Sequence, residues 1–140
     1  MAKITILAVG KCRERFFEEA AKEYLKRLTP YVSVQVIEVK EAGRLPARIP
    51  AEAYVIALAI EGKGTDSVSF AEHMQDLLRT GREIVFLIGD ADGLGNEEKE
   101  RADELLSMSG MTFPHQMARV ILLEQLYRGF RISNGAPYHK

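Results

Sequence analysis

The 140-residue chain lacks most of what would mark a secreted or membrane protein. Cys12 is its only cysteine, which excludes a disulfide framework and a multi-cysteine zinc site and favours a reducing compartment. Its longest apolar runs, such as Tyr54–Ile60, fall far short of the ~20 residues that cross a bilayer. The N-terminus opens on a strand-like run, Ile4–Val9, and has no basic-then-apolar signal peptide. We therefore expect a cytoplasmic protein with no membrane contact.

The chain also has little net charge, −1 in total, but this charge is unevenly distributed. Residues 1–48 carry a net +4, residues 49–113 a net −8 and residues 114–140 a net +3. This asymmetry is either chance in a small domain or the mark of a phosphate-facing surface built from the two ends of the chain. The small total charge fits recognition of a structured particle through a limited basic patch, and does not fit a general RNA binder.

Strand and helix patterns alternate along the sequence, which predicts one α/β domain over residues 1–140. Four apolar, β-branched runs are expected to be strands: 3–9, 32–37, 54–60 and 84–88. Amphipathic patterns predict helices at 14–28 and 69–79, and two more are expected at 96–106 and 114–130. Because the runs at 54–60 and 84–88 are apolar throughout, they favour a mainly parallel sheet flanked by helices.

Local signals place the starts of three of these helices. Ser69 and Glu72 have the spacing of a capping box, and Asn96 is a good N-cap with acidic residues in the turn that follows. Pro114 suits the first position of the last helix. That helix is apolar nearly all round, so it is either buried in the fold or shared with a partner subunit.

Two glycine-rich segments follow predicted strands. Gly89–Gly95 matches neither the dinucleotide fingerprint nor a calcium loop, and Arg101 stands where the calcium-binding glutamate would be. It is either a tight strand-to-helix connection or part of a ligand site at the carboxyl end of a strand. Gly62–Thr65 lacks the upstream glycine of a phosphate loop, and we interpret it as a turn.

Metal and nucleophilic sites find no support. The three histidines, His73, His115 and His139, include no pair at metal-ligand spacing. No G-x-S-x-G segment is present that would indicate a serine nucleophile. We therefore predict no metal.

The C-terminal third carries a resemblance to a known family. It lies in Leu106–Gln116, Arg119–Val120, Glu124–Arg128 and the final Pro137–Lys140. Matching segments nearer the N-terminus are 4–11, 23–27, Gly62-Lys63 and Ile88-Gly89. Together they resemble the ribosomal large-subunit rRNA pseudouridine methyltransferase family, small members of the knotted SPOUT class, over nearly the whole chain.

The resemblance implies a SPOUT-type α/β fold with a deep trefoil knot near the C-terminus, a homodimer, and S-adenosylmethionine as methyl donor. It implies methylation of N3 of a pseudouridine in 23S rRNA of the large ribosomal subunit. By position, the cofactor-binding residues are Leu58, Gly89, Met108, Ser109, Gly110, Met111, Thr112 and Phe113. Two features depart from the family: Asp90 stands where a second glycine is usual, and the connector at 41–50 is short.

The resemblance places Tyr138, His139 and Arg128 as the catalytic candidates, with Lys140 as a further anion contact. N3 of pseudouridine carries a proton, so methyl transfer requires a general base or an environment that stabilises the deprotonated imide. Which group is the base stays open. Arg128 has a second interpretation, because Glu124 lies four residues earlier and forms a favourable helix pair with it. The alternative function is a non-catalytic ligand- or RNA-binding protein that kept the SPOUT fold.

Overall fold

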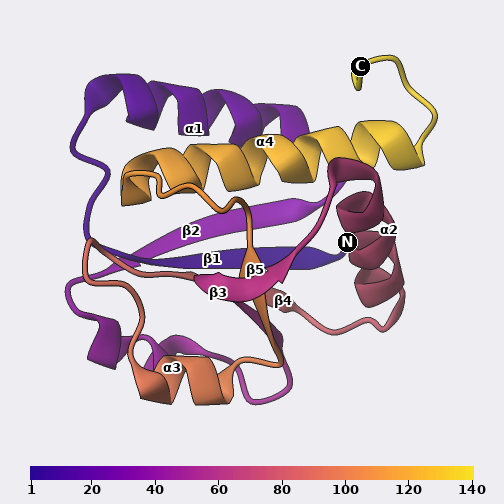
Figure 1. Cartoon of the computed structure of the whole chain (residues 1–140). Helices are drawn as coiled ribbons and strands as arrows, with labels where there is room; N and C mark the ends of the chain where they lie inside the picture. Colours follow the sequence, from indigo (N-terminus) through magenta and orange to yellow (C-terminus); the bar gives the residue numbers. More distant parts are fainter.

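The computed structural model describes residues 1–140 and contains one five-stranded sheet flanked by helices (Figure 1). All neighbouring strands are parallel, in the order β2-β1-β4-β3-β5, which confirms the predicted α/β class with a parallel sheet. The strands are β1 (Lys3–Val9), β2 (Ser33–Val39), β3 (Tyr54–Gly64), β4 (Ile84–Ile88) and β5 (Glu104–Ser107). The α-helices are α1 (Arg15–Leu28), α2 (Ser67–Arg79), α3 (Asn96–Arg101) and α4 (His115–Ser133). Two short 3-10 helices, Ala42–Arg44 and Pro46–Arg48, form the 41–50 connector.

Alternate side chains of the strands pack into two separate hydrophobic layers. On one face Ile4, Ile6 and Phe86 pack against α1, α2 and α4. On the other face Leu7 and Leu87 pack against Leu45 of the connector and other residues on that side. Because β1, β4 and the first half of β3 are buried on both faces, they carry the near-continuous apolar runs that identified them in the sequence.

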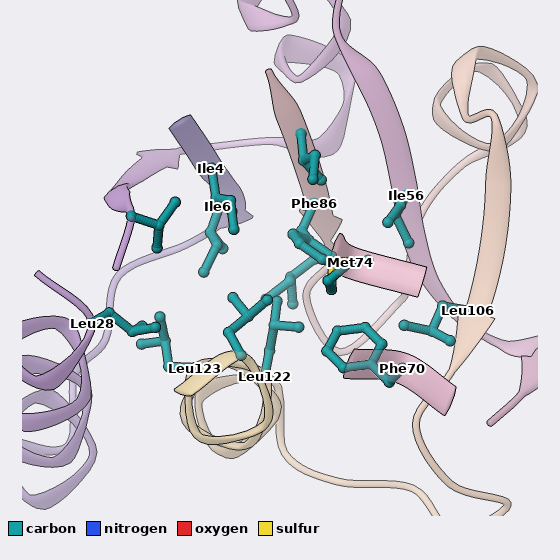
Figure 2. Packing of buried hydrophobic residues seen from close by; sticks show 14 of the residues in the cluster. Ile4, Ile6, Leu28, Ile56, Phe70, Met74, Phe86, Leu106, Leu122 and Leu123 are labelled. Carbon is teal, nitrogen blue, oxygen red and sulfur yellow. The ribbon is translucent and has the colours of Figure 1, made fainter. Parts of the chain in front are cut away.

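Helix α4 lies at the centre of the larger layer, between α1 and α2 (Figures 1 and 2). Its fully buried Leu122 and Leu123 point at the sheet, with Leu28 of α1 on one side and Phe70 of α2 on the other. Most of the helix's broad apolar surface is therefore covered within the chain. Its N-terminal part keeps an apolar side chain in solvent, Met117.

Two predicted helix caps are wrong. The N-cap of α2 is Asp66, whose Oδ1 accepts from the Ser69 backbone N–H at 2.8 Å, so Ser69 is inside the helix. Helix α3 has Gly95 as its N-cap with no side-chain cap bond, so Asn96 is its first residue. Pro114 directly precedes α4, one position earlier than predicted. In the first case two cap-like spacings overlap, and the aspartate makes the observed bond.

The helix predicted over 96–106 is also wrong, because α3 ends at Arg101 and residues 104–107 form β5. Asp103 explains the change. Its N–H donates to the Val55 carbonyl at 2.8 Å, and its Oδ2 accepts from the Val55 N–H at 2.7 Å. This exchange with β3 starts the pairing that continues as β5, and it lies 48 residues away in sequence. No local signal specifies it.

Candidate functional site

A cavity of about 820 Å³ opens at the carboxyl ends of β3, β4 and β5. Its walls are the end of β3, the β4–α3 loop, the β5–α4 segment and the first turn of α4. Seven of the eight residues that the resemblance assigns to the cofactor line it: Leu58, Gly89, Met108, Ser109, Met111, Thr112 and Phe113. Gly110 is exposed and is not among the lining residues. Loops that are distant in sequence thus meet where an open parallel sheet binds its ligands.

The first wall is a bulge in β3. Leu106 of β5 pairs with Leu58 and again with Lys63, so residues 59–62 bulge out of the ladder and 59–61 line the cavity. The strand then continues to Gly64, and the predicted turn at 62–65 is therefore wrong. Gly62 permits this crossing, because an added Cβ would lie 2.6 Å from the carbonyl carbon of Leu105.

The second wall is the β4–α3 loop, which folds back on itself. An added Cβ on Gly89 would lie 2.5 Å from the carbonyl carbon of Gly93, so the loop's own backbone requires glycine there. The Asp90 carbonyl accepts from the Gly93 N–H at 2.9 Å, and Asp90 Oδ1 accepts from the Asp92 N–H at 3.0 Å. Leu94, buried in the smaller layer, anchors the end of the loop. The loop is therefore a tight connection and a cavity wall at once.

The third wall is the segment between β5 and α4, which has its own side-chain bonds. Ser107 Oγ donates to the Ser109 carbonyl at 3.0 Å, and Ser109 Oγ accepts from the Met111 N–H at 2.9 Å. These bonds hold a turn that leaves the Met111 side chain 77% exposed at the cavity rim. Apolar side chains of this segment thus face space that no part of the chain fills.

Several wall residues were not predicted from the sequence. Lys99 and Glu61 form an ion pair at 2.7 Å between α3 and the β3 bulge, and this lysine lowers the pKa of the Glu61 carboxyl. His115 and Ala118 close the cavity on the side of α4. The position of His115 directly after Pro114 was the one signal available. Glu61 and Lys99 lie 38 residues apart, so nothing in the sequence links them.

The three catalytic candidates gather elsewhere, around Glu124 near the other end of α4. Arg128 Nη2 donates to Glu124 Oε2 at 2.8 Å, and the Tyr138 hydroxyl donates to the same oxygen at 2.8 Å. Nη1 of Arg128 lies 2.8 Å from Nδ1 of His139. Both interpretations of Arg128 therefore hold: it forms the helix pair, and that pair binds the C-terminal tail. We call Glu124, Arg128, Tyr138 and His139 the tail cluster.

None of the tail cluster lines the cavity. Ala118, on the cavity wall, and Arg128 are ten residues apart on one helix, which corresponds to about 15 Å along its axis. Figure 1 shows the C-terminus at the end of α4 opposite to its first turn. Burial and the bond to Glu124 raise the pKa of Tyr138 well above its ordinary value, so its phenol is protonated at neutral pH. Within one chain, tail and cavity are separate.

Two further searches of the chain complete the description. No three histidine, cysteine, aspartate or glutamate side chains lie close enough together to hold a metal ion. None of the helices combines the length and the apolar character that crossing a membrane requires.

Comparison with known proteins agrees with this geometry. Residues 2–139 match the family described as "Predicted SPOUT methyltransferase". The ribosomal RNA large subunit methyltransferase H of Shouchella clausii is 46% identical, covering 98% of this chain and 99% of the relative. That of Carboxydothermus hydrogenoformans is 44% identical, with 99% of each chain covered.

Solved structures support the fold alone. A methylase family protein from Haemophilus influenzae Rd KW20 matches with a TM-score of 0.61 at 13% identity, covering 99% of this chain and 70% of that one. A second one, from Neisseria gonorrhoeae, has a TM-score of 0.61 at 9% identity, covering 99% of this chain and 85% of that one. With full-length relatives above 40% identity and a family match from end to end, the chain belongs to the SPOUT methyltransferases, and within them to the family of the ribosomal RNA large subunit methyltransferases H.

Proposed function

We propose that this protein transfers a methyl group from S-adenosylmethionine to N3 of a pseudouridine in the 23S rRNA of the large ribosomal subunit. By family it is an rRNA methyltransferase, and the donor, the base and the atom are the finer part of the proposal. One observation carries it. Seven residues that the family resemblance assigns to the methyl donor, from three separate segments of the sequence, line one cavity.

The cavity suits S-adenosylmethionine by size and by chemistry. A volume of about 820 Å³ lies in the range of small-molecule sites, roughly 300–1,000 Å³. Leu58, Met108 and Phe113 offer apolar surface to the adenine, and backbone groups of the segment 108–113 offer hydrogen bonds to its edge. Lys99 supplies a cation for the carboxylate of the methionine moiety. Glu61 and Asp90 supply negative charge for its sulfonium and ammonium groups.

When bound, the donor supplies an electrophilic methyl group, and the protein must supply a deprotonated N3. The Tyr138 phenol is protonated in the tail cluster and donates to Glu124, so in this arrangement it orients groups and does not accept the proton. Arg128 can only donate, so Nδ1 of His139 is the acceptor in their contact and the imidazole is neutral there. We propose that Arg128 stabilises the negative charge of the imide and that His139 accepts the proton from N3.

The separation of tail and cavity leads us to propose a homodimer in which the tail of each chain serves the cavity of its partner. The tail cluster lies about 15 Å along α4 from its own cavity, too far for direct contact with a substrate held there. The trefoil knot, the organisation of residues 1–140 as one domain and the cytoplasmic location likewise stay proposals, supported by family membership.

Calorimetric titration with S-adenosylmethionine, followed by transfer of a labelled methyl group to isolated large subunits, whole ribosomes and free rRNA, tests the function. We expect binding, incorporation into 23S rRNA, and a modified nucleoside that mass spectrometry identifies as N3-methylpseudouridine. Gly89→Val should lose donor binding, because the added side chain displaces the loop that forms one wall. Donor binding without transfer to any RNA would favour the non-catalytic alternative. Absence of donor binding by the wild type would contradict the proposal.

A further inference from the structure

We infer that the β1–α1 loop, residues 10–15, is a contact surface for the phosphate backbone of the rRNA beside the methylated nucleotide, an inference that rests on the proposed function. The loop follows the carboxyl end of β1, at the edge of the sheet where the cavity opens. Figure 1 shows it beside the first turn of α4. None of its residues lines the cavity, so it is a separate surface.

The loop borders the cavity through α4. An added Cβ on Gly10 would lie 4.0 Å from Nε2 of His115, which lines the cavity. Next to it, the Glu14 N–H donates to the side-chain oxygen of Gln116 at 2.9 Å. Both ends of the loop therefore meet the first turn of α4. A nucleotide at the cavity would bring its neighbouring phosphates within reach of these residues.

A buried ion pair holds the loop from beneath. Arg119, only 4% exposed, donates to Glu38 Oε2 at 2.6 Å and to the Gly10 carbonyl at 3.3 Å. The same Glu38 oxygen accepts from the Cys12 N–H at 3.0 Å. Partial burial opposes the charge of Glu38, but the bonds from Arg119 and Cys12 outweigh it and lower the pKa of this carboxyl. The loop is thus fixed, and the charge of Glu38 is balanced from below.

What the loop presents to solvent is mostly positive. Lys11 and Arg13 are exposed and form no ion pair within the chain. Arg15 is paired with Glu19, and Glu14 is the one acidic side chain of the loop. The Phe16 ring, 63% exposed at the start of α1, follows directly. Two free cations two residues apart, next to an exposed aromatic ring, suit a strand of RNA better than a single small anion.

The opposite rim of the cavity explains why the backbone would follow this side. Asp90 and Asp92, on the β4–α3 loop, line the cavity and are exposed, and they repel phosphate. The favourable path for a polyanion therefore follows Lys11 and Arg13. This assigns the positive charge of the first 48 residues a place on the surface, which the sequence alone could not do.

The test compares three double variants by methyl transfer to isolated large subunits at several salt concentrations. Lys11→Gln/Arg13→Gln removes the two charges, and Lys11→Arg/Arg13→Lys keeps them. Lys26→Gln/Arg79→Gln removes two charges at the C-terminal ends of α1 and α2, at the opposite edge of the sheet. Donor binding by calorimetry and the thermal melting of each variant accompany the kinetics.

We expect the first variant to raise KM for the subunit at least about tenfold, with donor affinity and kcat little changed. The logarithm of affinity against the logarithm of salt concentration should flatten by about one unit per lost contact. The charge-keeping variant and the distant variant should behave like wild type. Phe16→Leu should raise KM about threefold without changing the salt dependence, because stacking is not ionic.

An unchanged KM and salt slope in Lys11→Gln/Arg13→Gln, with an active wild type, would overturn the inference and leave the proposed function intact. An equal rise in the Lys26→Gln/Arg79→Gln control would also overturn it, since total charge and not this loop would then set affinity. If the wild type methylates no ribosomal particle, the proposed function fails, and this surface has no substrate to contact. The wild-type measurement thus separates the two failures.

Discussion

Asp90 shows how one side chain joins local structure to ligand binding. It stands where the family usually has glycine, and its carboxylate oxygen Oδ1 closes a turn by accepting from the Asp92 N–H. The residue also lines the cavity, so its negative charge acts on any anionic group held there. Replacing it with glycine would remove both the charge and the turn bond. The charge alone is better tested with asparagine.

Asp90→Asn is expected to tighten binding of S-adenosylmethionine by up to about 1 kcal/mol, or about fivefold in Kd, because an exposed like-charge interaction is weak. The amide oxygen keeps the acceptor for the Asp92 N–H, so the turn persists. Calorimetric titration at low and high salt measures the effect, which should shrink at high salt. An unchanged Kd would show that the carboxylate acts only on the turn.

Residue types in the sequence specify only part of this site. The glycine-rich loop at 89–95 could be placed at the end of a buried strand from its own pattern. The remaining cofactor residues came from family resemblance, since a serine, a methionine or a threonine in an irregular segment carries no chemical signature. The Glu61–Lys99 pair could not be predicted, because it depends on how far the β3 bulge extends toward α3.

At the scale of elements, the crossing of β3 and β5 determines the shape of the cavity. Gly62→Ala should destabilise the protein by about 1–3 kcal/mol, because its Cβ would meet backbone atoms of Leu105 and Leu106 that cannot easily move. Urea unfolding measures the change. Because residues 59–61 line the cavity, donor affinity should fall as well.

Gly64→Ala is the matched control for this substitution. It adds the same methyl group to the same strand, two residues further on, where nothing lies within 4 Å of the new Cβ. We expect it to be neutral or slightly stabilising, since alanine loses less backbone entropy than glycine on folding. Equal stability of the two variants would contradict a backbone crossing that requires glycine at 62.

The cap of α2 gives a prediction on pH. The Ser69 N–H and hydroxyl both donate to the Asp66 carboxylate and lower its pKa below the ordinary 3.8. A carboxyl whose pKa is lower in the folded state adds stability above its unfolded pKa, and this stability is lost as the pH falls through the folded pKa. Urea unfolding from pH 6 to pH 3 should show wild type losing part of its advantage over Asp66→Asn below about pH 4. A constant difference across this range would contradict the assignment of the cap.

Local signals predicted most elements and failed where distant pairing decides. The runs at 3–9 and 84–88 matched their strands, since apolar β-branched residues buried on both faces leave no competing pattern. Residues 104–107 have no such pattern, and they follow a helical turn with no glycine or proline to end it. Their strand exists because Asp103 bonds to Val55, a contact that only the folded sheet brings about.

At the scale of the whole molecule, α4 connects two functional regions that do not meet within one chain. Its first turn closes the cavity, and its last turns carry Arg128 and bind Tyr138 and His139 through Glu124. The exposed side of the helix between them includes Met117, and a symmetric copy would cover it. A twofold arrangement of two chains could bring the tail of each beside the cavity of the other.

Complementation between two defective chains tests this arrangement. A chain lacking residues 138–140 should dimerise and bind the methyl donor, because its cavity and α4 are complete, yet transfer no methyl group. A Gly89→Val chain has a disrupted cavity wall and an intact tail. Co-expressed with different affinity tags and purified through both, the heterodimer contains one intact cavity facing one intact tail if the site is shared. It should therefore show about half of wild-type activity. Verified heterodimers without activity would mean that each chain completes its own site, with the tail leaving Glu124 to reach it.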